Sequence, residues 1–370
     1  MKAKAAVMTS VNKPIEVKEI TLDKPKDKEV LVKILATGVC HSDLNTLKDE
    51  TTPTPMVLGH EGAGQVVEVG SSVTTCRPGD HVILNWVPFC GVCAYCKTGK
   101  VNLCEAAFGP MFDGTLMDGT TRITIDSKKG YHCSLLSTFS EYAVVPEMSC
   151  VVIPREMPMA QASIIGCGVS TGFGASVYAA NVTPGSSVVV FGLGGVGVNA
   201  IIGADISGAS TIIACDLKQD NLNKVSKYGA THTINTSIVK DVVEEVKILT
   251  NGLGADFVID CTGNTKVGSL AWQCGRKGAT VVVIGAYPSN SEVSLPSGGF
   301  HRVSKVFKGS FYGDINPFKD FPLICKLYLQ GKYDLDSQII DNIQLEDINK
   351  VFDIFSDPKG KNMGRYVVKF

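Results

Sequence analysis

An apolar run that leads directly into a glycine-rich turn constrains this sequence more than any other feature. Residues 188–197 read VVVFGLGGVG, and the uncharged, mostly apolar segment 198–204 follows at once. In this order the pattern is typical of a strand, a tight turn and a helix, because the first glycine allows the turn and the third lets helix and strand pack closely. The sequence therefore predicts a parallel sheet covered by helices in this part of the chain.

The same turn predicts a dinucleotide-binding site. Its second glycine lets the backbone approach a pyrophosphate, and the N-terminus of the new helix favours the negative charge. Asp216 ends the next apolar run, 19 residues beyond Gly197, where a carboxylate binds the ribose diol and repels a 2′-phosphate, so NAD is preferred to NADP. A structural glycine turn without nucleotide is the alternative. The turn residues expected to bind the cofactor are Gly192, Leu193, Gly194, Gly195, Val196 and Gly197.

The length of 370 residues favours two domains. The pattern of apolar runs also changes along the chain. Before residue 160 the runs are short and separated by Gly, Pro, Asp and Thr, which is typical of an antiparallel β domain. After residue 183 helix-like segments lie between several of them. The expected strands are 29–35, 65–69, 81–84, 142–145, 188–191, 211–215, 257–260, 280–284, 306–309 and 365–370. The expected helices are 220–228, 238–250, 320–329 and 345–355.

Four cysteines share one short segment rich in Gly and Lys. They are Cys90, Cys93, Cys96 and Cys104, with the spacing C-x2-C-x2-C-x7-C. Four thiolates from one loop suit a closed tetrahedral zinc site, which stiffens a segment that has no core of its own. Bacterial ferredoxins begin with the same spacing, but their fourth cysteine follows sooner and precedes proline. We therefore expect a structural zinc ion, with four unrelated buried thiols as the alternative.

Charge and cysteine number exclude several classes of function. The formal net charge is -1, so no overall positive field directs the chain to nucleic acid or to an anionic membrane. Thirteen cysteines and an N-terminus without a signal-like apolar segment favour reduced thiols and a cytoplasmic protein over a disulfide framework. Residues 161–204 contain no charged side chain. Because glycines and a Pro-Gly pair interrupt this stretch, we expect buried core and loops rather than a membrane span.

Three further ligand candidates lie far apart in the sequence. Each candidate lies within a glycine-containing motif: Cys40 in GVCHSDL, His60 in LGHEGAG and Cys167 in IIGCGVSTG. Two cysteines and one histidine form the ligand set of an open, catalytic zinc site. Spacing alone does not show that the three converge, and singly each is typical of a buried core residue.

With these motifs the chain resembles the zinc-dependent medium-chain alcohol dehydrogenases, particularly the branch with a long structural-zinc lobe that includes classes I and III. The resemblance covers essentially the whole chain and rests on GVCHSD, LGHEGAG, GDHV, DGTTR, STFSEY, CGVSTGFGA, VFGLGGVG and GRYVVKF. It implies an α/β protein with a GroES-like, β-rich catalytic domain at residues 1–168 and 314–370. Residues 169–313 would form an NAD-binding Rossmann domain with a doubly wound parallel sheet.

The resemblance also implies roles for individual residues. Cys40, His60 and Cys167 would hold a catalytic zinc ion with Glu61 close by, Asp43 would orient the His60 ring, and the four-cysteine segment would hold a second zinc ion in each subunit. His41 and Arg365 would contact phosphate. The residues expected along the nicotinamide half are Thr171, Ile284, Gly285 and Ala286.

The implied reaction interconverts primary alcohols, aromatic or long-chain ones included, and aldehydes by hydride transfer to and from NAD. Ser42 would accept the alcohol proton, but Asn45 replaces the histidine that ends the relay in many class I enzymes. Trp86, Phe108 and Cys133 would line the substrate pocket. The expected partners are a small alcohol or aldehyde and further copies of the chain, as a homodimer or homotetramer, with no nucleic acid and no membrane.

Two alternatives to this function stay open. A glutathione-dependent formaldehyde dehydrogenase, which acts on S-hydroxymethylglutathione, is disfavoured because Phe108 stands where class III enzymes carry an arginine for a glutathione carboxylate. A non-catalytic zinc protein that binds partners through the four-cysteine segment is disfavoured because Cys40, His60 and Cys167 form a separate set of ligands.

Overall fold

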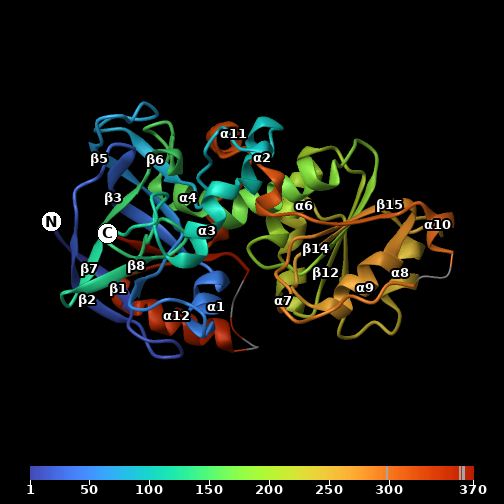
Figure 1. Ribbon diagram of the computed structural model, residues 1–370. Coiled ribbons are helices and arrows are strands. Elements are labelled where there is room, and N and C mark those ends of the chain that lie inside the picture. The colour runs from blue at the N-terminus through green and yellow to red at the C-terminus, as the bar shows by residue number, and fades with distance from the viewer. Residues whose placement is uncertain (297–298, 358–359, 361–362) are drawn as a thin grey trace. The chain divides into compact units, whose positions relative to one another are not determined.

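The computed structural model describes residues 1–296, 299–357, 360 and 363–370 (Figure 1). Contacts within the chain divide it into two compact units. Unit 1 contains Met1–Cys167 and Asn316–Phe370, and unit 2 contains Gly168–Ile315. The chain thus leaves unit 1 once, forms unit 2 and returns.

Unit 1 is built mostly from antiparallel β-structure, with two parallel pairs, β4 with β8 and β17 with β18. Strands β1, β2, β7, β8 and β4 form a closed barrel in that order, and a seven-stranded sheet has the order β10-β6-β5-β3-β18-β17, with β9 also paired to β3. The strands are β1 (Lys2–Met8), β2 (Glu16–Leu22), β3 (Glu29–Val39), β4 (Met56–Val57), β5 (Glu61–Val69), β6 (His81–Leu84), β7 (Ile123–Ile125), β8 (Lys128–His132), β9 (Tyr142–Pro146), β10 (Cys150–Val152), β17 (Ile339–Ile343) and β18 (Arg365–Lys369).

Helices of unit 1 are short and lie between these strands. Helix α4 packs against β3, β5 and β18, while α1 contacts α12. The α-helices are α1 (His41–Lys48), α2 (Ala94–Lys97), α3 (Glu105–Asp113), α4 (Met159–Ile164), α11 (Pro317–Leu329) and α12 (Ile348–Ser356). The 3-10 helices are η1 (Val101–Leu103), η2 (Glu147–Ser149), η7 (Asp336–Gln338) and η8 (Leu345–Asp347).

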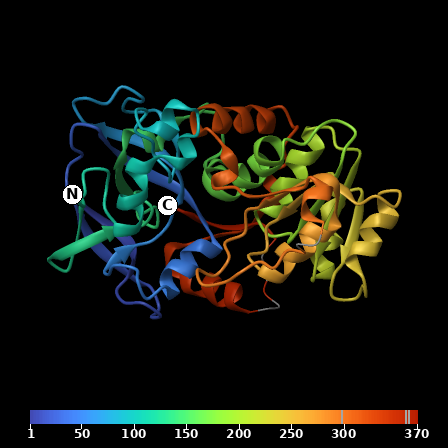
Figure 2. The same ribbon diagram turned by 45° about the vertical axis from the view of Figure 1, so that its right-hand side comes forward.

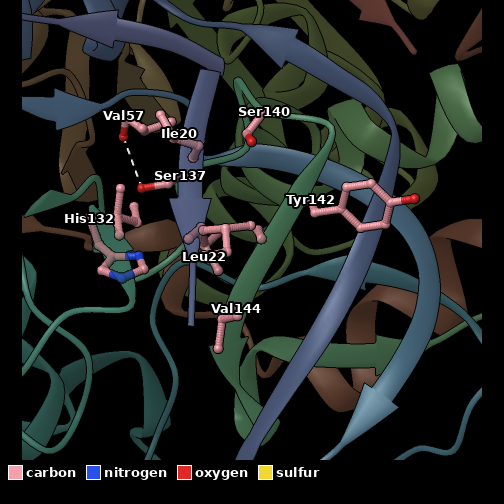
Figure 3. Close-up of a pocket in the computed structure, with 11 residues that line it drawn as sticks. Ile20, Leu22, Val57, His132, Ser137, Ser140, Tyr142 and Val144 are labelled. Atoms are coloured by element: carbon pink, nitrogen blue, oxygen red, sulfur yellow. Dashed lines mark hydrogen bonds between the residues drawn. The ribbon is translucent and has the colours of Figure 1, made fainter. Parts of the chain in front are cut away.

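Side chains fill the interior of the barrel (Figure 3). About 160 Å³ of space lies among Ile20, Leu22, Val57 and their neighbours, and none of it can hold a water molecule. His132 is fully buried here, and its Nε2 accepts a hydrogen bond from the backbone N–H of Arg122 at 3.1 Å. Its Nδ1 has no hydrogen-bond partner among the described residues. The barrel is therefore a packed core and not a ligand cavity.

Unit 2 contains a six-stranded parallel sheet in the order β13-β12-β11-β14-β15-β16. Counted within the unit this is the order 3-2-1-4-5-6 of a doubly wound nucleotide-binding fold. The strands are β11 (Ser187–Phe191), β12 (Thr211–Asp216), β13 (His232–Asn235), β14 (Ala255–Asp260), β15 (Gly275–Val283) and β16 (Val306–Gly309). The predicted fold class, a β-rich domain plus a parallel α/β sheet, is confirmed.

Helices cover both faces of this sheet (Figures 1 and 2). Helix α6 packs on β11 and β12, and α9 packs on β11, β14 and β15. The helices of unit 2 are α5 (Ser170–Gly174), η4 (Ala175–Ala180), α6 (Gly197–Ile206), α7 (Gln219–Leu222), η5 (Val225–Tyr228), α8 (Val242–Leu249), α9 (Thr265–Cys274), α10 (Phe300–Val303) and η6 (Tyr312–Asp314). All six strands are parallel, so their carboxyl ends lie along one edge, where the glycine-rich turn follows β11.

The uncharged stretch differs from the expectation of core and loops. Its first part belongs to one helical run, Met159–Ala180, which is long and apolar enough to cross a membrane by length and composition. However, 89% of its most apolar window is buried inside the protein, as in the core helix of a globular protein. The run changes to a π-helix at η3 (Ile165–Val169) and again at η4. Its glycines fit this helix because neighbouring backbone comes close: a Cβ on Gly172 would lie 2.1 Å from the Val196 carbonyl oxygen.

All four predicted helices have different limits. The helix α11 starts at Pro317 rather than at residue 320, and the segment 345–355 is divided into the 3-10 helix η8 and the α-helix α12. The segment 220–228 is not one helix, because α7 ends at Leu222 and a 3-10 helix, η5, follows at Val225–Tyr228. The helix expected from residue 238 starts at Val242, because the Asp241 side chain caps it by accepting a hydrogen bond from Glu244 N–H at 3.0 Å.

Candidate active site

Asp43 connects the first turn of α1 to the ring of His60. One carboxylate oxygen accepts a hydrogen bond from the backbone N–H of Cys40, the residue that precedes α1, at 2.9 Å. The other oxygen accepts a hydrogen bond from His60 Nδ1 at 2.9 Å, and the carboxylate is fully buried. A donating Nδ1 leaves Nε2 as the ring nitrogen with a lone pair, which is the arrangement of histidines that bind metals.

The three dispersed ligand candidates converge in unit 1. The ligand atoms of Cys40, His60, Glu61 and Cys167 all lie within 4.8 Å of one another. Cys40 directly precedes α1, His60 directly precedes β5, and Glu61 is the first residue of β5. Cys167 belongs to the π-helix η3, a local widening that is frequent at functional sites. Sequence spacing could not show this convergence, because it depends on how the strands pair.

A buried ion pair lies beside this cluster. Arg365 Nε donates to both carboxylate oxygens of Glu61 at 3.0 Å, and its terminal nitrogen lies 3.5 Å from Cys40 Sγ. The pair needs room that only glycine provides, since a Cβ on Gly38 would lie 2.2 Å from a Glu61 oxygen. A hydrogen bond with Cys167 and the Arg365 cation hold the pKa of Cys40 well below its usual range, although burial opposes them.

These donors fit a catalytic zinc ion. Cys40 and Cys167 offer two sulfurs and His60 offers Nε2, which is a ligand set that leaves a fourth position open. The Arg365 cation satisfies the Glu61 carboxylate, so a buried carboxylate close to the ligands keeps its charge compensated. The Asp43 hydrogen bond supplies the partner that such a histidine requires.

Three residues with predicted pocket or proton-transfer roles lie close to the ligand cluster. The Trp86 ring meets His60 edge-on with centroids 6.2 Å apart, and Cys133 groups with Asp43 and His60 within 4.8 Å. Cys40 Sγ lies 3.7 Å from Ser42 Oγ, close enough for a weak hydrogen bond. Pocket and proton-transfer roles for Trp86, Cys133 and Ser42 stay predictions.

Three other predicted residues make contacts of a different kind. The His41 ring stacks on Phe355 with centroids 4.4 Å apart. Arg365 is buried in its pair with Glu61. Phe108 lies on α3, 6.3 Å from the ring of Phe112. Phosphate contacts for His41 and Arg365, and a pocket role for Phe108, stay predictions.

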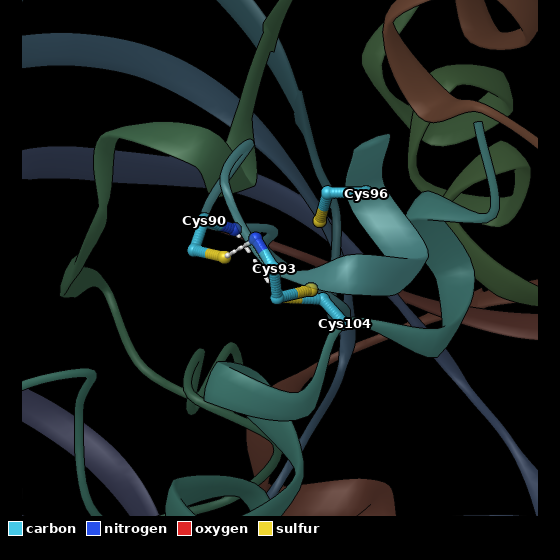
Figure 4. Close-up of side chains that lie close together, drawn as sticks. All are labelled: Cys90, Cys93, Cys96 and Cys104. Carbon is cyan, nitrogen blue, oxygen red and sulfur yellow. Dashed lines mark hydrogen bonds between the residues drawn. The ribbon is translucent and has the colours of Figure 1, made fainter. Parts of the chain in front are cut away.

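The four-cysteine segment also forms one cluster (Figure 4). The sulfur atoms of Cys90, Cys93, Cys96 and Cys104 lie within 4.8 Å of one another. Backbone N–H groups point at them: Cys90 donates to Cys104 Sγ at 3.2 Å and Cys93 to Cys90 Sγ at 3.3 Å. Hydrogen bonds from Cys96 and Glu105 N–H groups lower the pKa of Cys93 to about 6. Four sulfurs with N–H donors and no open position fit a structural zinc ion.

Glycines shape the turn that follows β11 in unit 2. Gly192 has a φ of +85°, and a Cβ on Gly197 would lie 1.8 Å from the Gly192 carbonyl oxygen. The Asp216 carboxylate accepts hydrogen bonds from the backbone N–H groups of Leu193 at 2.7 Å and Lys218 at 2.8 Å. Thr171 Oγ1 is buried without a hydrogen-bond partner among the described residues. A glycine-rich turn after β11, a carboxylate beside it and the Thr171 hydroxyl in the same unit fit a dinucleotide.

Sequence reasoning missed two residues at this edge of the sheet. Asp260 ends β14, and Tyr287 follows β15; their side chains share a hydrogen bond of 2.6 Å. A carboxylate at the end of a predicted strand was a visible signal for Asp260. No local pattern indicated that Tyr287 would be its partner.

Family comparisons agree with this geometry. Residues 26–155 match the family model of the alcohol dehydrogenase GroES-like domain, and residues 195–328 match that of zinc-binding dehydrogenases. The chain is 41% identical over 364 residues to S-(hydroxymethyl)glutathione dehydrogenase of Paracoccus denitrificans, covering 96% of each protein. It therefore belongs to the zinc-dependent medium-chain alcohol dehydrogenase family. It is an NAD-dependent zinc alcohol dehydrogenase, with NAD and zinc as cofactors.

Solved structures agree with the family. An alcohol dehydrogenase zinc-binding domain protein from Burkholderia ambifaria has a TM-score of 0.95 and 33% identity, covering 100% of this chain and 99% of that one. Benzyl alcohol dehydrogenase from Acinetobacter calcoaceticus has a TM-score of 0.93 and 31% identity, with the same coverage.

Proposed function

We propose that the protein oxidises a primary hydroxyl group to an aldehyde, or reduces the aldehyde, at the cluster of Cys40, His60 and Cys167. The convergence of these three ligands within 4.8 Å carries the proposal. Residues 1–168 and 314–370 would act as the catalytic, zinc-binding domain and residues 169–313 as the NAD-binding domain. The four-cysteine cluster would hold a second, structural zinc ion.

In this mechanism the protein's own groups bind, orient and move a proton. A zinc ion supplies a Lewis acid that favours loss of the alcohol proton, and NAD supplies the hydride acceptor. Asp43 holds Nδ1 of His60, so the ring keeps one orientation. Ser42 accepts the hydroxyl proton and passes it toward solvent. The Glu61–Arg365 pair keeps the surroundings of the ligands fixed and neutral.

Cofactor binding follows the geometry of unit 2. The turn at residues 192–197 would receive the pyrophosphate, Asp216 the adenosine ribose, and Thr171 with residues 284–286 the nicotinamide half. Leu193 N–H donates a hydrogen bond to Asp216, so the turn is joined directly to the expected ribose site. His41 and Arg365 would add phosphate contacts.

S-(hydroxymethyl)glutathione is the substrate that the comparisons favour. Relatives that are 39–41% identical over 96–97% of the chain carry this activity in their names. They favour it over the primary alcohol preferred in the sequence analysis, and this substrate also presents a primary hydroxyl group.

A primary aromatic alcohol is the second candidate, and a different observation favours it. Helix α3 holds Phe108, Glu105 and Asp113 but no basic residue that could bind a glutathione carboxylate. Trp86 meets His60 edge-on, as an apolar wall would. A solved relative with a TM-score of 0.93 is named benzyl alcohol dehydrogenase.

One assay separates the two candidates. NADH formation is followed with formaldehyde alone, with formaldehyde plus glutathione, and with benzyl alcohol. The first candidate predicts that glutathione is required and that this pair has the highest kcat/KM; the second predicts the highest kcat/KM for benzyl alcohol without glutathione. A Phe108→Arg variant is a matched test, because it should improve only the glutathione adduct. No NADH from any of these would contradict the proposed activity.

Assembly and location complete the proposal. We expect a homodimer or homotetramer in the cytoplasm. The edges of the six-stranded sheet are β13 and β16, and we expect another copy to pair at one of these two strands. Sedimentation of the purified protein tests the assembly.

A further inference from the structure

Asp260 joins two loops at the carboxyl edge of the parallel sheet. Its side chain is fully buried. One carboxylate oxygen accepts hydrogen bonds from the backbone N–H of Thr262 at 2.8 Å and from its hydroxyl at 2.7 Å. The other oxygen accepts a hydrogen bond from Tyr287 Oη at 2.6 Å. One carboxylate thus holds the loop after β14 and the loop after β15.

The backbones of these loops are also in direct contact. The Asp260 carbonyl oxygen accepts hydrogen bonds from the N–H groups of Ile284 at 2.9 Å and Gly285 at 3.0 Å. A Cβ on Gly285 would lie 2.2 Å from the nitrogen of Gly263, and one on Gly263 would lie 2.6 Å from the Ala286 carbonyl oxygen. The position of residues 284–286 therefore depends on how firmly Asp260 and its partners hold both loops.

A glycine in helix α9 leaves room for the Tyr287 hydroxyl. A Cβ on Gly268 of α9 would lie 2.3 Å from Tyr287 Oη, so a larger residue would displace the hydroxyl. Burial and the Asp260 carboxylate both raise the pKa of Tyr287, so the phenol remains a hydrogen-bond donor at physiological pH.

The anchored loops lie next to the glycine-rich turn. A Cβ on Gly192 would lie 2.9 Å from Thr262 Cγ2. The turn follows β11 and the two loops follow β14 and β15, which are successive neighbours in the sheet. In open α/β sheets ligands bind outside the carboxyl ends of the strands, where the strand order reverses; here that place lies between β11 and β14.

We propose that Asp260 and Tyr287 are a pair of positioning residues that hold residues 284–286 in place for the nicotinamide half of the cofactor. The inference rests on the proposed cofactor site and deepens it, because it adds positioning residues for the nicotinamide half to the adenosine site assigned to Asp216. Losing the Tyr287 hydroxyl leaves Asp260 without one of its donors and frees the end of the β15 loop. In a variant without this hydroxyl, nicotinamide binding has to order a segment that is already ordered in the unaltered protein.

The test compares two ligands on the full-length, zinc-loaded protein. Dissociation constants are measured for NADH, by its fluorescence, and for ADP-ribose, which lacks nicotinamide, by calorimetry. The variants are Tyr287→Phe and, as matched control, Tyr328→Phe, which removes another tyrosine–aspartate hydrogen bond, of 2.9 Å to Asp336 in unit 1. We expect about 5- to 10-fold weaker NADH binding in Tyr287→Phe, unchanged ADP-ribose binding, and no change in the control.

A Gly268→Ala variant reaches the same hydrogen bond by a different route. Its new Cβ should displace the Tyr287 hydroxyl and weaken NADH binding to a similar extent. Combined with Tyr287→Phe it should add little, because the hydroxyl it displaces is already gone. Additive losses in the double variant would contradict the pair.

Other outcomes would overturn the inference in distinguishable ways. Unchanged NADH binding in Tyr287→Phe would show that the pair positions nothing. Equal losses for NADH and ADP-ribose would show a general structural role. If the unaltered protein binds neither ligand, the proposed cofactor site itself fails.

Discussion

Single buried residues decide how the candidate zinc ligands are presented. Asp43 serves both the first turn of α1 and the His60 ring, and Arg365 neutralises Glu61 beside Cys40. The sequence allowed the ligands to be predicted through resemblance, yet it contained no signal for the contact between Arg365 and Glu61. That contact joins residues 304 positions apart, which meet only because β18 pairs with β3.

Replacing Asp43 tests the orientation of His60. An Asp43→Asn variant retains the shape but loses the charge that favours a donating Nδ1. We expect about 10- to 100-fold weaker zinc affinity at this site, measured by competition with a chelator, while the four-cysteine site keeps its zinc. Asp80→Asn is the matched control, since Asp80 accepts a hydrogen bond from Arg77 N–H outside the site. Equal zinc affinity in the two variants would refute the role of Asp43.

His132 makes the stability of unit 1 depend on pH. Burial, aided by the Arg122 cation, lowers the pKa of His132 from 6.5 to about 3. The unfolded chain then binds a proton below pH 6.5 that the folded protein does not, so stability falls as the pH drops from 6.5 toward 3. From pH 7 to 5 this group contributes a loss of about 2 kcal/mol.

Chemical unfolding at pH 7 and pH 5 measures this contribution. A His132→Gln variant should lose less stability between the two pH values than the unaltered protein. His301→Gln removes an exposed histidine and should leave the pH dependence unchanged. If His132→Gln shows the full pH dependence, the buried neutral histidine is not its source.

At the scale of elements, strands were easier to predict than helices. The runs 81–84 and 306–309 were predicted with the limits that β6 and β16 have, because each is a short run that contains β-branched or aromatic residues and lies between polar residues. The helical run from Met159 was missed, since its glycines suggested loops while contacts with neighbouring backbone keep them in a helix. The strand β13 (His232–Asn235) was also missed, because its four residues are mostly polar and only pairing with β12 defines them.

The four-cysteine element supplies a test of its own. A Cys96→Ser variant should bind one zinc ion fewer per chain and unfold at a lower temperature, because this segment has little core besides its ligands. NADH binding in unit 2 should persist. Cys76→Ser, at a half-buried thiol outside both clusters, should keep the full zinc content. Full zinc content in Cys96→Ser, measured by atomic emission, would contradict the structural zinc site.

At the scale of the whole molecule, two compact units divide the chemistry. Unit 1 holds both cysteine-containing clusters, and unit 2 holds the glycine-rich turn with Asp216. Cys167 is the last residue of unit 1 before the chain enters unit 2. A division into two units was predictable from the change in the pattern of apolar runs along the sequence. The meeting of Cys40, His60 and Cys167 was not, since it requires the complete fold of unit 1.

The most direct test of the account is zinc content together with NADH formation in a Cys167→Ala variant. The unaltered protein should contain two zinc ions per chain. The variant should contain one, bind NADH with unchanged affinity, and oxidise its best substrate at least about 100-fold more slowly. Cys325→Ala, at a buried thiol of α11, is the control and should keep both ions. A Cys167→Ala variant that retains two zinc ions and full activity would contradict the account.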